Sequence, residues 1–264
     1  MKNKFEIPEL SVEELSHALY EANLKLIDAN KRLKDEEKQR LDFYANISHD
    51  LRAPVTAISN SIEYLLSASN LSKNETQETL VIIQKRTEYL QKLINDIFLL
   101  SSLESSDQKV HKEPVDLGFF LEDYYYMNCN DIISDNVEFD LDIPENMSVI
   151  TQMDPHLMQR VLDNLINNSL KYRREQLHIV LSTRLEGDTI IIQLSDNGKG
   201  IAKKHIPYIF DRSYTADRSR TPNSDASSGF GLSIVQKIIE RHNGTISCES
   251  ELNKGCTFTI QIPV

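Results

Sequence analysis

The residues best suited to chemistry in the first half of the chain are His49 and Asp50, within the segment from Phe43 to Pro54. Histidine is neutral and nucleophilic near pH 7, and an adjacent carboxylate can orient its ring while the other ring nitrogen attacks. Pro54 has no backbone N–H, so a helix can bend beside the ring. A lone histidine on a polar helix is usually a solvated surface residue, but this segment predicts a nucleophilic His49 assisted by Asp50.

A second set of polar residues lies on a strong helical pattern at 156–172. Asn164 and Asn168 are four residues apart and therefore share a helical face, and Lys171 and Tyr172 follow one turn later. Amide oxygens can hold magnesium without repelling the phosphates that it bridges, and Lys171 adds a positive charge. Two asparagines alone would be ordinary surface residues, so this prediction depends on the segments that follow.

Two glycine-containing segments complete the set. Residues 196–201 (DNGKGI) follow a predicted strand; their carboxylate can accept from the exocyclic amine of adenine, and their glycines let the backbone approach a flat ring. Residues 228–233 (SGFGLS) open a predicted helix whose N–H groups can receive phosphate. The combined segments predict an ATP site that contains Asn164, Asn168, Lys171, Tyr172, Asp196, Gly198, Gly200, Ile201, Gly229, Gly231 and Leu232.

Between these segments lies a long polar stretch. Residues 209–214 (IFDRSY) are followed by residues 217–227, which are rich in Ser, Arg, Asp and Pro. A polar loop of this length is uncommon unless it is functional. We expect it to be a nucleotide lid, in which Arg212, Arg218 and Arg220 are candidate phosphate contacts and Tyr214 is a candidate nucleotide contact. At least one of the three arginines is expected to be merely solvated.

Two long helical patterns must position His49. Apolar residues recur at alternating steps of three and four, which is the heptad pattern of a coiled coil, at Val12, Leu15, Leu19, Ala22, Leu26, Ala29 and Leu33. We favour a parallel homodimeric coiled coil over a helix that packs on its own domain. The helical pattern continues to Leu66, breaks at 67–74 and resumes from about Glu75 to Leu103. Two such helical hairpins predict an all-α dimeric four-helix bundle.

The second half predicts an α+β (α/β sandwich) domain. Helices are expected at 117–133 and 156–172, and strands at 137–143, 147–151, 178–184, 189–194, 245–249 and 257–262, after a polar link at 105–114. The predicted domains are therefore a coiled-coil helix at 1–40, a dimerisation hairpin that carries the nucleophilic His49 at 41–108, and an ATP-binding domain at 109–264.

Composition excludes several classes of protein. Of 264 residues, 29 are Lys or Arg and 40 are Asp or Glu, a net charge of −11 that argues against a nucleic-acid binder. The apolar runs are far shorter than the roughly 20 residues that a membrane helix needs. Three cysteines, with spacings that match no zinc pattern, favour a reducing compartment. We expect a cytoplasmic chain, either alone or as the cytoplasmic portion of a membrane-anchored protein.

Both halves resemble one known family. Residues 43–54 are similar to the phosphoacceptor segment of bacterial two-component sensor histidine kinases, and residues 163–172, 196–201 and 228–233 resemble the ATP-binding domain that these kinases share with gyrase, mismatch-repair and chaperone ATPases. The resemblance implies a homodimer that uses ATP and magnesium to phosphorylate His49. It also implies that the phosphoryl group passes to an aspartate on the receiver domain of a response regulator.

Three positions depart from the family pattern. Asp50 stands where Glu is more frequent, and Ser213 and Thr215 replace the usual Phe and Arg of the lid segment. Ala53 stands where many relatives carry Thr or Asn, four residues after the histidine. Because a methyl group cannot orient a water molecule, Ala53 predicts weak phosphatase activity towards the regulator. The alternative to an enzyme is a non-catalytic dimeric scaffold, but the complete set of His49, both asparagines, Asp196 and the glycines favours the kinase.

Overall fold

The structure is a computed structural model that describes residues 11–68, 71–105, 110–133, 136–145, 147–212, 214 and 229–264, without the side chains of residues 36, 39, 40 and 42. The chain divides into two compact units, residues 1–52 and residues 53–264, and each is described by itself. Within the described residues, no helix carries an apolar stretch long enough to cross a membrane.

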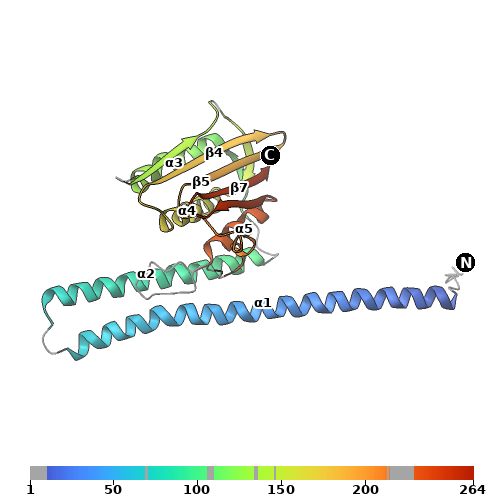
Figure 1. Cartoon of the computed structure of the whole chain (residues 1–264), viewed down its shortest axis with the longest axis horizontal. Coiled ribbons are helices and arrows are strands. Elements are labelled where there is room, and N and C mark those ends of the chain that lie inside the picture. Colours follow the sequence, from blue (N-terminus) through green and yellow to red (C-terminus); the bar gives the residue numbers. More distant parts are fainter. Residues whose placement is uncertain are drawn as a thin grey trace, which may run out of the picture. The chain divides into compact units, whose positions relative to one another are not determined.

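Two long helices form the N-terminal half (Figure 1). Helix α1 (Val12–Ser67) continues through Pro54, and helix α2 (Lys73–Glu104) follows a short connection. The start of α2 is fixed by a capping box, in which Ser72 Oγ accepts from Glu75 N at 3.2 Å and Glu75 Oε2 accepts from Ser72 N at 2.9 Å. The sequence therefore predicts both helices, but the break expected at 67–74 is shorter, since α1 includes Ser67 and α2 begins at Lys73.

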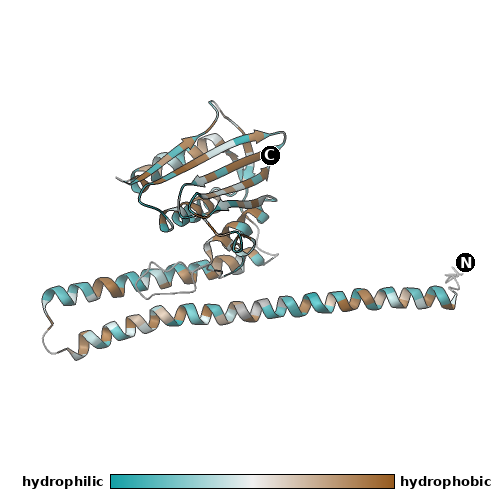
Figure 2. Cartoon of the chain, viewed as in Figure 1, coloured by the Kyte–Doolittle hydropathy of each residue, from teal (hydrophilic) through white to brown (hydrophobic). Residues whose placement is uncertain are grey.

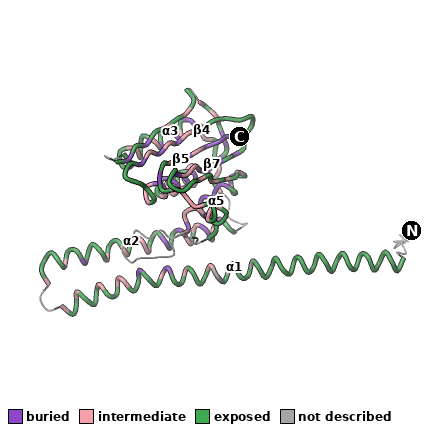
Figure 3. The backbone as a smooth tube through the Cα atoms, in the orientation of Figure 1, coloured by how far each residue is buried: buried purple, intermediate pink, exposed green. Residues whose placement is uncertain are grey.

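The N-terminal part of α1 is amphipathic but is not covered within the single chain. Apolar and polar residues alternate along it (Figure 2), and Figure 3 shows most of its length exposed. The heptad side chains of Leu15, Leu19 and Leu26 are each at least 60% exposed. An apolar seam of this kind is typical of a helix that pairs with another helix.

The C-terminal half is an α/β sandwich. Its elements are β1 (Glu113–Asp116), α3 (Leu117–Ile132), β2 (Val137–Asp142), β3 (Ile150–Met153), α4 (Pro155–Lys171), β4 (Leu177–Glu186), β5 (Thr189–Asp196), the 3-10 turn η1 (Ile206–Tyr208), α5 (Gly231–Arg241), β6 (Thr245–Glu251) and β7 (Gly255–Pro263). Five strands form one sheet in the order β2-β4-β5-β7-β6, in which only the β2–β4 pair is parallel. The predicted α-helical region followed by an α/β sandwich is thus confirmed.

The sheet's core side is lined by alternate residues. Along β4, Leu177, Ile179 and Leu181 are buried while the residues between them are partly exposed, so the two faces of the strand differ in burial. Helices α3 and α4 contact strands β2 and β4 respectively, and α5 packs against α4, β6 and the C-terminal part of α2. The helices therefore supply the second layer of the core.

Two strand predictions need correction. The strand expected at 147–151 lies at Ile150–Met153, and the expected polar link contains strand β1 at Glu113–Asp116. These two strands pair with each other, from Glu113 opposite Met153 to Asp116 opposite Ile150. Because β1 has one apolar residue besides proline, Val115, its pairing with β3 rather than a local pattern defines it.

Candidate functional site

Helix α4 carries the predicted metal-binding amides and begins at a well-defined cap. Asp154 is its N-cap residue and accepts from Leu157 N at 3.1 Å, and Pro155 occupies the first turn, where its missing N–H costs nothing. The helix buries one face, including Leu162 and Leu165, against the sheet. Asn164 and Asn168 lie at partly exposed positions.

The structure brings Asn164 to the start of α5. Asn164 Nδ2 donates to the carbonyl of Arg160 at 2.9 Å, which leaves its Oδ1 directed towards Gly231, the first residue of α5. A Cβ atom at position 231 would lie 3.0 Å from this oxygen, so glycine permits the close approach. The N-terminus of α5, at Gly231, thus adjoins the amide side chain of Asn164.

Asp196, at the end of β5, is held by two hydrogen bonds. Its Oδ2 accepts from Ser169 Oγ at 2.9 Å, and its Oδ1 accepts from Gly198 N at 2.8 Å. The carboxylate is partly exposed, so it can still accept from a ligand. Ser169 is buried on α4 directly after Asn168; sequence reasoning did not assign it a role, and its only signal was that position.

The loop after Asp196 contacts the β6–β7 hairpin. Gly200 has a φ of +66°, and a Cβ atom there would lie 2.1 Å from the carbonyl oxygen of Glu251, so only glycine fits without movement. Ile201 N donates to Ser250 Oγ at 2.7 Å. The loop geometry is therefore set by strand β6 as well as by its own residues.

Lys171 and Tyr172 lie at the C-terminal end of α4. Lys171 Nζ is 5.2 Å from the centroid of the Tyr172 ring, within the range of a cation–π contact. The carbonyl of Tyr172 accepts from Lys199 N at 3.0 Å, so the end of α4 is joined to the loop that contains Gly198 and Gly200. The C-terminal end of α4 and the loop at 196–201 are therefore neighbours, and their joint role in a nucleotide site stays a prediction.

The structure describes only the edges of the predicted nucleotide lid. Arg218, Arg220 and Thr215 lie outside the described residues, as does Ser213. Arg212 forms an ion pair with Glu104, at the C-terminal end of α2. Tyr214 Oη and His205 Nδ1 are hydrogen-bonded at 2.6 Å. Gly229, with a φ of +70°, precedes α5.

His49 and Asp50 lie on α1, in the first unit. The side chain of His49 is 65% exposed, whereas that of Asp50 is buried. His49 Nδ1 and Asp50 Oδ1 are 3.4 Å apart. If Nδ1 carries the proton and donates it to this carboxylate, Nε2 keeps its lone pair for nucleophilic attack.

The polar residues of α4 fit a magnesium ion that is shared with phosphates. Within the described ranges, no cluster of three or more His, Cys, Asp or Glu side chains can hold a metal by itself. The directed Oδ1 of Asn164 is a neutral oxygen ligand of the kind that magnesium accepts, with the remaining ligands coming from phosphate and water. Asn168, one turn further along the same face, is the second candidate ligand.

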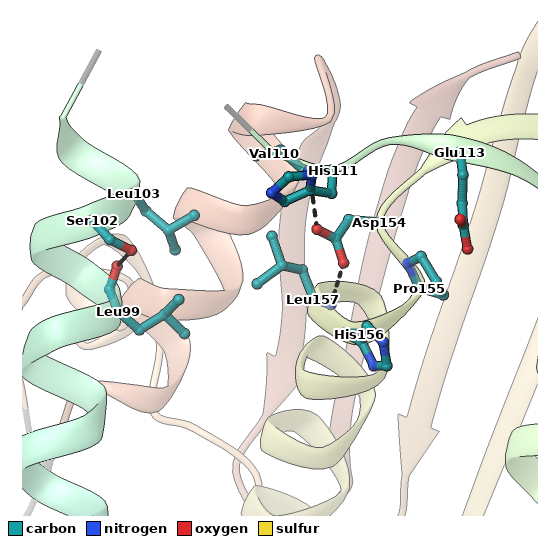
Figure 4. A pocket seen from close by; sticks show the side chains of 10 residues that line it. All are labelled: Leu99, Ser102, Leu103, Val110, His111, Glu113, Asp154, Pro155, His156 and Leu157. Carbon is teal, nitrogen blue, oxygen red and sulfur yellow. Dashed lines mark hydrogen bonds between the residues drawn. The ribbon is translucent and has the colours of Figure 1, made fainter. Parts of the chain in front are cut away.

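The structure also shows contacts between α2 and the sandwich that the sequence did not reveal. Asp96 of α2 is buried and pairs with Arg160 of α4 at 2.5 Å, and Arg241 of α5 donates to the carbonyl of Leu103 at 2.8 Å. A pocket of about 400 Å³ lies beside these contacts (Figure 4). Its wall is formed by the end of α2, residues 110–113 and the start of α4, where His111 N donates to Asp154 Oδ2 at 3.2 Å.

Two family models match the chain. The His Kinase A (phospho-acceptor) domain matches residues 39–106, which include His49, and the histidine kinase-, DNA gyrase B-, and HSP90-like ATPase matches residues 153–264, which include the whole candidate ATP site. The sensor protein kinase WalK of Staphylococcus aureus is 31% identical over 229 residues, which are 86% of this chain and 54% of that protein. The chain thus spans about half the length of this relative, and 37% of longer WalK sequences.

Solved structures agree on the fold. The histidine kinase AdeS of Acinetobacter baumannii has a TM-score of 0.63 at 21% identity, covering 81% of this chain and 97% of that one. The histidine kinase ThkA, solved in complex with the response regulator protein TrrA, has a TM-score of 0.68 at 20% identity, covering 88% of this chain and 66% of that one. With both domain models in order along one chain, and WalK as a relative, this protein belongs to the two-component sensor histidine kinases.

Proposed function

We propose that the chain is the catalytic core of an ATP-dependent protein-histidine kinase, which phosphorylates its own His49 and passes the phosphoryl group to an aspartate of a response regulator. The observation that supports this most strongly is the meeting of Asn164 Oδ1 with Gly231 at the N-terminus of α5. An oxygen ligand for a cation beside N–H donors for an anion is the arrangement that a metal-bound triphosphate requires.

Each part of ATP has a matching group. Asp196, oriented by Ser169 and Gly198, accepts from the exocyclic amine of adenine, which guanine does not offer at that position. Lys171 and the start of α5 attract the phosphates, and Asn164 and Asn168 would hold a magnesium ion, which would supply positive charge beside them. Arg212, which pairs with Glu104, has further N–H donors and is a candidate phosphate contact.

Phosphoryl transfer needs a nucleophile with an available lone pair. Asp50 accepts the Nδ1 proton of His49, so Nε2 attacks the γ-phosphorus; the Nε2–P bond forms as the bond between that phosphorus and the bridging oxygen breaks, and ADP leaves. The exposed ring can then meet the carboxylate of a receiver-domain aspartate. ThkA, solved with a response regulator, is a structural precedent for this partner.

The active unit in this proposal is a homodimer. The exposed heptad seam from Val12 to Leu33 supports a coiled coil at residues 1–40, followed by the phosphotransfer hairpin at 41–108 and the ATP-binding domain at 109–264. We place the kinase in the cytoplasm, where ATP and regulators are found, as a free protein or as part of a membrane-anchored sensor.

Calorimetric titration with ATP, with and without magnesium, tests the site. Asp196→Asn removes a charged acceptor, so affinity should fall in both conditions by roughly ten- to a hundredfold, the equivalent of about 1.5 to 3 kcal/mol. Asn168→Ala should weaken binding only when magnesium is present. Asp142→Asn, at an exposed position on β2, is the matched control and should bind normally.

Normal ATP binding by both site variants would show that the nucleotide site is misplaced. Absence of ATP binding in the unmodified protein would favour the non-catalytic scaffold instead.

A further inference from the structure

Two of the three cysteines lie together on the last two strands. In the antiparallel β6–β7 pair, Cys248 is opposite Phe258 and Ser250 is opposite Cys256. Because residues two apart on a strand share a face, Cys248 and Cys256 are diagonal neighbours on one face of the sheet. Both are partly exposed, and the pKa of each thiol is shifted by the other thiol.

The two thiols have different acidities. Interaction with the Cys248 thiol lowers the pKa of the Cys256 thiol, against burial, which raises it. Interaction with Cys256, together with burial, raises the pKa of Cys248. Since the thiolate is the reactive form, Cys256 is the nucleophile of the pair and Cys248 is a thiol held in contact with it.

This pair adjoins the candidate adenine loop. In the β5–β7 pair, Cys256 lies directly opposite Asp196. Ser250, which contacts Cys256 Sγ, also accepts from Ile201 N at 2.7 Å and donates to the carbonyl of Gly255 at 2.7 Å. A change in the spacing of β6 and β7 at the cysteines therefore acts on both sides of the adenine loop.

We propose that Cys248 and Cys256 are a reversible thiol-oxidation site, at which peroxide forms an intramolecular disulfide that weakens ATP binding. The disulfide itself is independent of the proposed kinase function, whereas its effect on ATP rests on that function. A transient, regulatory disulfide is the kind expected of cysteines in a reducing compartment.

The chemistry balances with hydrogen peroxide as oxidant. The Cys256 thiolate, having released its proton to solvent, attacks one peroxide oxygen; the O–O bond breaks, and sulfenic acid and hydroxide form, the hydroxide taking up a proton to give water. The Cys248 sulfur then attacks the Cys256 sulfur and loses its own proton, and a second water leaves. Two thiols and one peroxide thus give one disulfide and two waters, and a dithiol reductant reverses the reaction by being oxidised itself.

The diagonal geometry explains why a disulfide would displace the strands beside the adenine loop. Diagonal Cα atoms on antiparallel strands are about 7–8 Å apart, whereas disulfide-linked Cα atoms are about 4.4–6.8 Å apart. Closing the bridge therefore draws β6 and β7 together by roughly 1 Å or more at Cys256, opposite Asp196. The resulting strain also makes such a bridge easy to reduce.

Peptide mapping of the full chain tests the disulfide directly. Trypsin cuts after Arg241 and Lys254, so the two cysteines fall in separate peptides, 242–254 and 255–264. After mild peroxide treatment and alkylation of the remaining thiols, we expect these two peptides linked, with the loss of two hydrogens. Cys129 on α3, whose sulfur lies 3.5 Å from the Tyr126 carbonyl oxygen, is the internal control. It should stay a free thiol under peroxide and therefore be alkylated.

Single variants identify the reacting sulfur. Cys248→Ser should leave a sulfenic acid on Cys256 that a dimedone probe captures, whereas Cys256→Ser should give neither the linked peptides nor a probe adduct at position 248. Linked peptides that contain Cys129 at equal yield, or oxidation of both cysteines without linkage, would overturn the proposal.

The effect on ATP is measured on the same samples. The oxidised chain should bind ATP roughly tenfold more weakly than the reduced chain, as expected if about one hydrogen bond at Asp196 is lost, and a dithiol should restore binding. Cys256→Ser should bind ATP equally before and after peroxide. Linked peptides with unchanged affinity would refute the coupling, and a reduced chain that binds no ATP would refute the proposed function while the mapping still decides the disulfide.

Discussion

Gly200 and Gly187 form a matched pair that isolates the contact between the adenine loop and strand β6. Both have a positive φ, +66° and +60°, so alanine at either position incurs the left-handed backbone penalty of about 1–2 kcal/mol. They differ in surroundings: a Cβ atom at Gly187 meets nothing within 4 Å, whereas one at Gly200 lies 2.1 Å from the Glu251 carbonyl oxygen.

This difference in surroundings predicts a difference in the free energy of unfolding between the two alanine variants. Gly187→Ala should cost about 1 kcal/mol of unfolding free energy. Gly200→Ala should cost a further 1–3 kcal/mol or so, because the loop or the hairpin must move by roughly 1 Å to relieve the overlap. At about 2–4 °C per kcal/mol for a domain of this size, Gly200→Ala should melt a few to about 12 °C below Gly187→Ala.

ATP titration supplies the second readout. The displacement caused by Gly200→Ala falls on the loop that contains Gly198 and Ile201, so ATP affinity should decrease; Gly187→Ala, in the β4–β5 turn, should bind ATP normally. Equal melting temperatures and equal affinities for the two variants would refute the steric reasoning and the placement of the adenine loop.

Three further predictions concern pH, dimerisation and dephosphorylation. Burial lowers the pKa of His242, so below about pH 6.5 the unfolded chain takes up a proton that the folded chain does not. The free energy of unfolding should therefore decrease as the pH falls from about 7 to 5. The urea midpoint should depend less steeply on pH in His242→Gln than in the unmodified chain. Leu26→Lys should loosen the coiled coil but leave the bundle dimer, and sedimentation of a compact monomer for the unmodified chain at micromolar concentration would contradict the dimer. Ala53→Thr should accelerate dephosphorylation of a purified phosphorylated regulator without loss of autophosphorylation, whereas equal acceleration by the unmodified chain would show that Ala53 is irrelevant.

Elements with local signals were predictable from the sequence. Helix α4 has a strong apolar periodicity, and its start one residue before the expected 156 follows from the Asp154 cap and the proline at position 155. Strands β4 and β7 carry apolar residues at the spacing of a half-buried sheet, and β5 carries the continuous apolar run 190–192. The candidate site residues stay predictions, which depend on the occurrence of the asparagine helix and both glycine-containing segments in one chain.

What could not be predicted depends on contacts between distant residues. Strand β1 exists through its pairing with β3, and no periodicity marks it. Asp96 looks like a surface residue of α2, but it is buried because Arg160, 64 residues later, neutralises it. The engagement of Arg212 by Glu104 likewise joins segments about a hundred residues apart, which no local pattern reveals.

The central claim is that His49 receives the γ-phosphoryl group of ATP, and one labelling measurement tests it. The full chain is incubated with γ-labelled ATP and magnesium, and the labelled residue is identified together with its acid stability. We expect an acid-labile label on His49 that is absent in His49→Gln, while that variant binds ATP with unchanged affinity. A label that survives acid, or that persists in His49→Gln, would contradict the account.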